Sequence, residues 1–325
     1  MKNNTLFISG SGRSGTNITK AILSQHSLVG TLPFEYRFSV DPNGVLDFYN
    51  TFPAAWSPFI ASKKCKDFIS FLKSLARRDQ ELFLKSKEIL EKHNKGLELT
   101  PYPYHGWELE KVFPGYENFV DSLEKNLVEF KYNAVWPGSE PLVENHEMLF
   151  CAPKSKKDLQ PILTHFFDQC VNAFLENEQK EVFVEDNTWS ILFADDLLDL
   201  FPNGKILHVV RNPFDVIASM VKQRWTPSDV SDATKYYKAI MSHWLSKREK
   251  LSPDQFLEVK LEDLTQNTEA TINQICQFAG LKFEASMLDI DLSKSNSGRY
   301  KTQFTTKQIL VIEESISEIL FNYGY

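Results

Sequence analysis

The first forty residues show short apolar runs separated by polar and glycine-rich stretches. Residues 5–9 form an apolar, partly β-branched run, residues 10–15 are rich in glycine, and residues 18–23 carry apolar side chains at helical spacing. This succession predicts a strand, a loop and a helix. A second apolar run, at 28–32, predicts another strand, which ends near Glu35.

The same alternation returns in the second half of the chain. Apolar runs predict three more strands and the helices between them: strands at 182–184, 205–210 and 256–261, and helices at 190–200, from Pro213 onward and at 270–279. Pro213 suits the first position of a helix that Asn212 precedes. Strands that alternate with helices predict an α/β protein, with a parallel β-sheet flanked by helices on both faces. In this sheet we expect the strand 28–32 to lie beside the strand 5–9.

Between about Asp41 and Glu181 the pattern is mainly helical. We therefore expect a single domain over 1–325 with a large, mainly helical insertion at about 41–181. The aromatic side chains of this insertion suit a ligand pocket or, more simply, an ordinary helical core. An amphipathic helix predicted at 64–93 could pack internally or against a second copy, so the sequence leaves the oligomeric state open.

Composition and charge narrow the class of protein. The chain has 325 residues, 42% of them hydrophobic, and a formal net charge of -7, which does not favour nucleic-acid binding through bulk charge. The four cysteines stand singly, which argues against a structural zinc site and a disulfide scaffold. The first strand begins close to Met1, so we expect no signal peptide, no transmembrane segment and a cytoplasmic location.

The glycine-rich loop from Gly10 to Asn17 has the features of a phosphate-binding loop. It joins a strand to a helix, where backbone N–H groups and the positive end of the helix converge on an anion. It nearly fits the Walker pattern, but Thr16 stands in the place of the lysine and Asn17 in that of the magnesium-binding hydroxyl. The positive charge lies instead on Arg13, within the loop. These differences argue against an ATPase and predict phosphate binding without a metal.

A second anion site is predicted where the strand 205–210 ends. Arg211 follows this strand directly, and Ser219 lies two turns into the next helix. Both can face the crevice in which parallel sheets of this kind bind ligands. An arginine at such a place can also be a simple surface ion-pair partner, and the pairing with the first loop favours the anion site.

These two segments together resemble the sulfotransferases that use 3′-phosphoadenosine 5′-phosphosulfate (PAPS). The matching stretches are Gly-Arg-Ser-Gly-Thr-Asn at 12–17 and Val-Val-Arg-Asn-Pro-x-Asp-x-x-x-Ser at 209–219. A third stretch, 294–305, is similar to the C-terminal loop that covers the cofactor in that family, although Arg299 and Tyr300 replace an Asp-Trp pair. The resemblance implies a P-loop NTPase-like sulfotransferase fold, PAPS as donor, adenosine 3′,5′-bisphosphate (PAP) as product, and no metal.

The resemblance also implies roles for particular residues. The first loop would bind the 5′-phosphosulfate, Arg211 and Ser219 the 3′-phosphate, and Lys294 would add charge beside that phosphate. The implied cofactor-binding residues are Gly12, Arg13, Ser14, Gly15, Thr16, Asn17, Arg211, Ser219, Lys294 and Arg299.

Sulfuryl transfer to a hydroxyl or amine needs a base near the acceptor and positive groups around the leaving phosphate. Glu35 is the candidate base, because family members that act on carbohydrates or on protein tyrosines carry a glutamate at a similar distance after the loop. The chain resembles these members more closely than the cytosolic ones with a histidine base. Arg13 is the candidate catalytic cation. A salt-bridged loop glutamate is the plain alternative for Glu35, and the other candidate bases are His26, His105, Glu185 and Asp186.

The chain departs from the family pattern at two places. Many members carry a lysine after the strand that corresponds to 182–184, whereas this chain has Asp186 and no lysine there. Leu261 stands where a tyrosine usually contacts the adenine, so Trp225 or Tyr300 would have to supply the stacking surface.

The predicted function is therefore metal-independent transfer of a sulfuryl group from PAPS. Two alternatives stay open from the sequence: a protein that binds the cofactor without catalysis, and a P-loop kinase of small molecules. The acceptor could be a small molecule, a carbohydrate or a peptide, and the helical insertion is expected to form part of its site.

Overall fold

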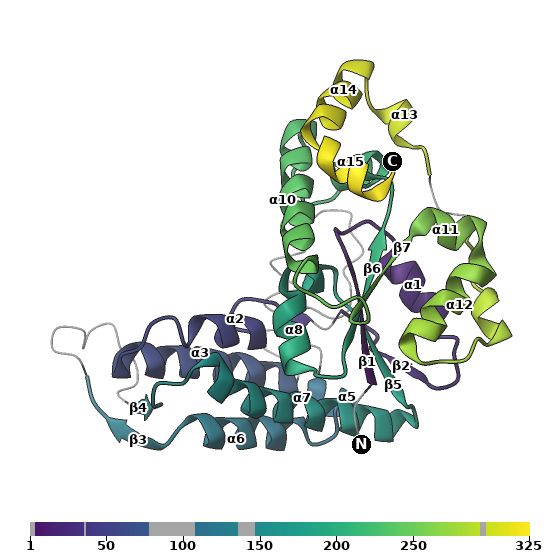
Figure 1. Ribbon diagram of the computed structural model, residues 1–325. Coiled ribbons are helices and arrows are strands. Elements are labelled where there is room, and N and C mark those ends of the chain that lie inside the picture. Colours follow the sequence, from purple (N-terminus) through teal and green to yellow (C-terminus); the bar gives the residue numbers. More distant parts are fainter. Residues whose placement is uncertain (1–3, 36, 78–107, 136–146, 293–296) are drawn as a thin grey trace, which may run out of the picture. The chain divides into compact units, whose positions relative to one another are not determined.

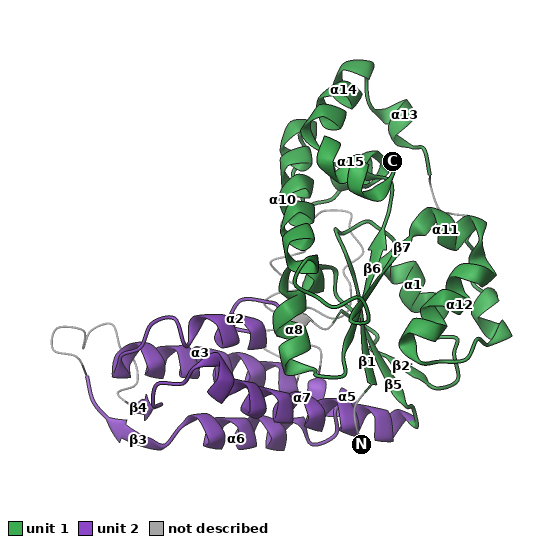
Figure 2. Cartoon of the chain, viewed as in Figure 1, with its two compact units in different colours: residues 1–36, 179–325 green, residues 37–178 purple. Residues whose placement is uncertain are grey.

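The computed structural model describes residues 4–35, 37–77, 108–135, 147–292 and 297–325. The chain divides into two compact units, coloured separately in Figure 2. One contains residues 1–36 and 179–325 and is called the sheet unit below. The other contains residues 37–178 and is called the helical unit.

The sheet unit is built on a five-stranded sheet with the order β2-β5-β1-β6-β7. Every neighbouring pair in it is parallel. The strands are β1 (Asn4–Gly10), β2 (Val29–Thr31), β5 (Val182–Asp186), β6 (Lys205–Val210) and β7 (Phe256–Lys260). The predicted parallel sheet is thus confirmed. The expected pairing of the second strand with the first is wrong, because β5 lies between β1 and β2.

The central strands are covered on both faces, as their continuous apolar runs require. Successive side chains of β1 point to opposite faces. Leu6 and Ile8 belong to a core that also contains apolar residues of α1 (Thr16–Leu23) and α12 (Thr268–Ala279). Phe7 points to the other face, where its ring meets that of Phe201 edge-on at 4.9 Å. In Figure 1, α1 and α12 cover one face, and α8 (Ala194–Leu200) and α10 (Val230–Arg248) cover the other.

The remaining helices of the sheet unit follow the strands or complete its C-terminal part. They are η4, a 3-10 helix at Thr188–Phe193, α9 (Pro213–Met220), α11 (Leu261–Gln266), the 3-10 helix η5 (Ala285–Leu288), α13 (Tyr300–Gln303), α14 (Thr306–Ser315) and α15 (Ser317–Tyr323). The single helix predicted at 190–200 is in fact this 3-10 turn followed by α8, because the Asn187 side chain accepts from the Trp189 N–H and starts the turn early.

The helical unit consists of helices and one hairpin in its described residues. Its elements are the 3-10 helix η1 (Arg37–Ser39), α2 (Val45–Thr51), α3 (Pro58–Ala76), α5 (Leu109–Val112), α6 (Tyr116–Leu127), α7 (Lys156–Glu178) and the antiparallel strands β3 (Phe130–Asn133) and β4 (Glu147–Phe150). Ser57 caps α3 and Pro58 is its first residue. The helix predicted at 64–93 ends at Ala76, and the rest of that range lies outside the described residues apart from Arg77.

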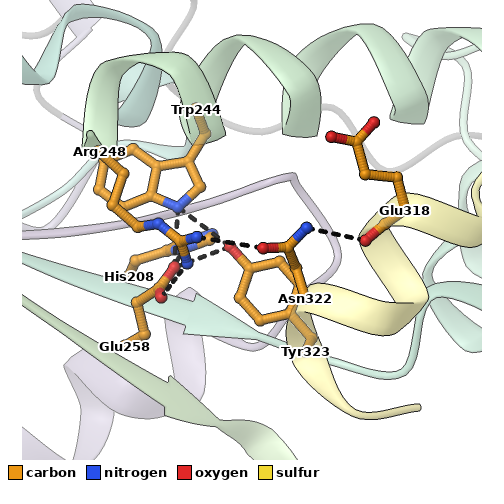
Figure 3. A network of polar contacts seen from close by, with 7 residues as sticks. All are labelled: His208, Trp244, Arg248, Glu258, Glu318, Asn322 and Tyr323. Carbon is orange, nitrogen blue, oxygen red and sulfur yellow. Dashed lines mark hydrogen bonds and ion pairs between the residues drawn. The ribbon is translucent and has the colours of Figure 1, made fainter.

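A partly buried polar network anchors the C-terminal helix to the sheet (Figure 3). One oxygen of Glu258, on β7, accepts from Trp244 Nε1 at 2.8 Å and from the Tyr323 hydroxyl at 2.7 Å, and lies 2.9 Å from His208 Nδ1. The other oxygen accepts from Arg248 at 2.7 Å. Burial alone would raise the pKa of Glu258, but these hydrogen bonds and the charge of His208 lower that pKa to about 2. The carboxylate therefore stabilises the fold in its charged form.

We expect Tyr323→Phe to lower the free energy of unfolding by about 1.5 kcal/mol at neutral pH, since the variant loses a hydrogen bond to a charged acceptor. A carboxyl with a depressed pKa stabilises the fold above its ordinary value, and this contribution fades as the pH falls from 4.5 towards about 2. The deficit of the variant should shrink over the same range. Urea unfolding at a series of pH values measures it, with Tyr132→Phe on β3 as the matched control. A deficit that stays constant with pH would contradict this account of Glu258.

Candidate functional site

The loop between β1 and α1 has the backbone of an anion-binding loop. Gly12, Arg13 and Gly15 have positive φ values of 79°, 60° and 112°. At Gly15 this conformation needs glycine, and a Cβ there would also lie 2.8 Å from a methyl carbon of Leu261. Arg13 adopts a left-handed conformation that non-glycine residues rarely take, and such strain is concentrated at functional sites. Turned residues of this kind direct successive N–H groups to one side.

The start of α1 is open to an anion. Its N-cap residue is Gly15, and no side chain caps its first turn. The Ser14 hydroxyl is buried and makes no hydrogen bond within the described residues. Buried polar atoms normally have partners, so an unpartnered hydroxyl inside this loop points to a ligand. Thr16 and Asn17 form the first turn of α1, where unpaired backbone N–H groups favour negative charge. The loop therefore fits a phosphate or sulfate group.

The structure brings the two predicted anion sites together. The Arg13 side chain donates from Nε to the Ser219 hydroxyl at 3.0 Å. Arg211 is mostly buried and donates to the backbone oxygen of Arg13 at 3.2 Å. These residues follow β1 and β6, which are neighbours in the sheet. These contacts put two guanidinium groups at one edge of the sheet.

A third arginine joins this group from the C-terminal segment. Burial lowers the pKa of Arg211, Asp215 and Glu262 oppose that change, and the positive charges of Arg13 and Arg299 lower it further. Arg299 is exposed, and its segment is tied to α9 because the Asp215 carboxylate accepts from the N–H groups of Gly298 (2.7 Å) and Tyr300 (3.2 Å). Three positive guanidinium groups close to one another favour a bound anion of high charge.

The loop that carries Arg211 is fixed by its neighbours. Asn212 caps α9, with its side-chain oxygen accepting from the N–H of Phe214 at 3.0 Å. The N–H of Asn212 donates to Glu262 at 2.9 Å, and the other oxygen of Glu262 accepts from the Tyr325 hydroxyl at 2.8 Å. Asp215 and Glu262 are positioning residues that the sequence did not single out. Both stand in motifs that were noticed, and their partners could not be known without the fold.

Leu261 and three aromatic residues lie around the loop or the segment that follows it. Leu261 is almost fully buried in the core and packs against Gly15, so it supports the loop. Trp225 is 49% exposed and packs against Gly12, whose missing Cβ leaves room for the indole. Tyr300 stacks on Phe214 with ring centroids 5.0 Å apart. Trp225 thus offers an aromatic surface beside the loop, and its predicted role in stacking adenine stays a prediction.

Carboxyl groups gather near the end of β5. Burial raises the pKa of Glu185 well above its usual range, and the charges of Asp186 and Glu35 raise it further. Ser190 donates to one oxygen of Glu185 at 3.3 Å. Glu35 follows β2, which pairs with β5. It therefore approaches the end of β5 from a strand that β5 separates from β1. Glu35 is partly exposed, whereas Glu185 is buried and its pKa is raised. Exposure suits Glu35 better to act on an incoming acceptor.

The remaining candidates divide between structural roles and undescribed parts. His26 is buried, with Nε2 2.8 Å from the Lys282 carbonyl oxygen and Nδ1 accepting from the Leu28 N–H, so both ring nitrogens have backbone partners. Lys294 and His105 lie outside the described residues. Within the described ranges, no cluster of three or more His, Cys, Asp or Glu side chains is arranged to hold a metal ion.

The fold and the site define a class of protein: an α/β protein whose first loop and neighbouring arginines have the geometry and charge to hold a phosphate-bearing ligand. The family model described as "Sulfotransferase family" matches residues 84–285, more than half of the chain. The chain therefore belongs to the sulfotransferase family.

Individual relatives match over shorter stretches. The omega-hydroxy-beta-dihydromenaquinone-9 sulfotransferase Stf3 of Mycobacterium bovis is 28% identical over 145 residues, which cover 40% of this chain and 37% of that protein. Sulfotransferase 2A1 of Rattus norvegicus is 30% identical over 144 residues, 38% of this chain and 48% of that protein. The chain thus spans less than half the length of these curated relatives. Among solved structures, sulfotransferase STF9 from Mycobacterium avium aligns with a TM-score of 0.49 at 12% identity, over 99% of this chain and 77% of that one.

Proposed function

We propose that this chain transfers the sulfuryl group of PAPS to an acceptor hydroxyl, or to an amine, and releases PAP. The observation that carries the proposal is the contact of Arg13 with Ser219, 206 positions apart in the sequence, beside a loop that keeps an unpartnered buried hydroxyl. Two anion sites at one edge of a sheet suit a nucleotide with separate 5′ and 3′ phosphate groups. Membership of the sulfotransferase family supports the same reaction.

The donor would be held by residues already described. The backbone of 12–17 and the Ser14 hydroxyl would bind the 5′-phosphosulfate, and Arg211, Ser219 and Arg299 the 3′-phosphate. PAPS supplies the activated sulfuryl group. The chain contributes fixed N–H dipoles and guanidinium groups, which stabilise negative charge without having to reorganise during the reaction. No step in this scheme calls for a metal.

Glu35 would act as the general base. It would accept the proton of the acceptor hydroxyl while the acceptor oxygen attacks sulfur. The raised pKa of the neighbouring Glu185 favours its protonated form, which adds no second negative charge beside the base. Arg13 would face the charge that develops on the transferred group and the leaving phosphate.

The acceptor is proposed to be an alcohol on an apolar skeleton. The matched Mycobacterium bovis protein is named for an omega-hydroxy menaquinone, and another matched relative, from Cavia porcellus, is named 3-beta-hydroxysteroid sulfotransferase.

The acceptor role predicted for the helical segment at about 41–181 stays a prediction, which hydrogen exchange with and without acceptor would test. Among the described residues, no helix is of a length and apolarity that would let it cross a bilayer. A cytoplasmic location is part of the proposal, and cell fractionation tests it.

Calorimetric titration with PAP in the presence of EDTA tests the donor site. We expect binding with one PAP per chain, and no loss of affinity when magnesium is absent. A kinase of small molecules would instead bind ATP with magnesium and show little affinity for PAP. Absence of PAP binding at millimolar ligand would remove the proposed donor.

A further inference from the structure

One lysine beside the phosphate loop has no role in the scheme above. Lys20, on α1, donates to the carboxylate of Asp186 at 2.7 Å. The side chains are 17% and 5% exposed, so the pair is largely shielded from water. Burial raises the pKa of Asp186, and the ammonium of Lys20 opposes that change by contact and by charge.

The position of this pair is set by the fold. Asp186 is the last residue of β5 and Gly10 the last of β1, and these strands are parallel neighbours, so both residues lie at the same edge of the sheet. Lys20 is four residues after Thr16, where α1 begins. Side chains on a helix lean towards its N-terminus, so the stem of Lys20 runs back over the first turn of α1. The ammonium is therefore held near the start of α1, on the β5 side of the loop.

Arg13 lies on the other side of the loop. Its guanidinium is engaged with Ser219 on α9, which follows β6, and β1 separates β6 from β5 in the sheet. The two cations thus flank the loop from opposite sides. Arg13 is directed towards the second anion site. Among the described residues, Lys20 is the cation that an ion pair holds on the β5 side of the loop.

A partly buried ion pair adds little net stability compared with apolar side chains, whereas a fixed ammonium beside developing negative charge can lower a reaction barrier. We propose that Lys20 is a catalytic cation that contacts the 5′-phosphate of the donor, and that Asp186 is its positioning residue. The inference rests on the proposed function. In this proposal, Lys20 supplies the positive charge that many family members place on a lysine after the strand and that residues 184–188 lack.

The step itself is balanced without a further reactant. The acceptor oxygen forms a bond to sulfur, the bond between sulfur and the bridging oxygen of the 5′-phosphate breaks, and its electron pair stays on that oxygen. The acceptor proton goes to Glu35. Lys20 keeps its protons and stabilises the new charge on the phosphate.

Three variants separate a catalytic role from a structural one. Lys20→Met leaves the buried Asp186 carboxylate without its partner, and by itself it could simply destabilise the fold. The double variant Lys20→Met/Asp186→Asn removes both charges, so it should fold normally yet transfer the sulfuryl group at least about tenfold more slowly. The double variant Lys20→Met/Asp186→Lys returns an ammonium from the strand side and should recover much of the rate.

Ligand binding provides a readout that does not depend on turnover. In the neutral double variant, we expect the affinity for PAP to fall by about tenfold or more, with no change for adenosine 3′-monophosphate, which lacks the 5′-phosphate. Calorimetry measures both. Equal affinity of wild type and the neutral double variant for PAP would overturn the proposal, and so would wild-type turnover in that variant. If the wild type binds PAP but transfers nothing, the proposed function fails, and the PAP comparison still decides whether Lys20 contacts the phosphate.

Discussion

Glu35→Gln should lower the rate of sulfuryl transfer by roughly 10²- to 10⁴-fold, because a glutamine cannot accept the proton of the acceptor. The affinity for PAP should not change, since Glu35 is not among the residues proposed to bind PAP. Single-turnover kinetics with saturating PAPS measures the rate, and calorimetry measures the affinity. The expected result is a loss in kcat with an intact donor site.

Glu185→Gln is the matched control for this substitution. Burial raises the pKa of Glu185 and so favours its protonated form, and glutamine has nearly the same shape and also donates a hydrogen bond. The fold and the rate should therefore both be retained. If Glu185→Gln is inactive and Glu35→Gln is active, the base is the buried carboxyl, and our assignment of Glu35 is wrong.

Arg211→Ala should weaken PAP binding by about 1.5 to 3 kcal/mol, the usual range for a hydrogen bond to a charged group. Arg211 is expected to bind the 3′-phosphate, and it also holds the backbone of the phosphate loop through the oxygen of Arg13. The loss should fall mainly on ligands that carry a 3′-phosphate. Calorimetry with PAP and with adenosine 5′-monophosphate, which has none, separates the two effects.

Arg77→Ala is a suitable control because it removes the same charge from an exposed position in the helical unit, where Arg77 pairs with Glu117. It should leave the affinity for PAP unchanged. An Arg211→Ala variant that binds PAP as tightly as Arg77→Ala does would take Arg211 out of the donor site.

Local sequence pattern was enough to predict most of the sheet unit. The strands β1, β6 and β7, the helix that Pro213 starts, and the phosphate loop all follow from apolar period, glycine and capping residues within short windows. Local pattern does not predict which strands lie beside one another in the sheet. β5 enters the sheet between β1 and β2 although about 150 residues separate it from β2 and about 170 from β1, and successive strands are adjacent only about two-thirds of the time.

Local pattern also could not predict which residues contact one another at the site. Lys20 meets Asp186 across 166 positions, and the segment with Arg299 docks on Asp215 across more than 80. The motifs showed which residues carry charge, and the fold showed which charges meet. Leu261 stands at a motif position where a tyrosine usually contacts the adenine. The motif did not show what this leucine does instead, and the structure shows that it packs against Gly15.

The central claim is that this chain moves a sulfuryl group from PAPS without a metal. The most direct test follows radiolabelled sulfur from PAPS to a panel of apolar alcohols, with EDTA present throughout and PAP release measured in parallel. We predict labelled acceptor and PAP in equal amounts, at a rate that EDTA does not change. PAP binding with no transfer to any acceptor, or turnover of ATP with magnesium in place of PAPS, would contradict the claim.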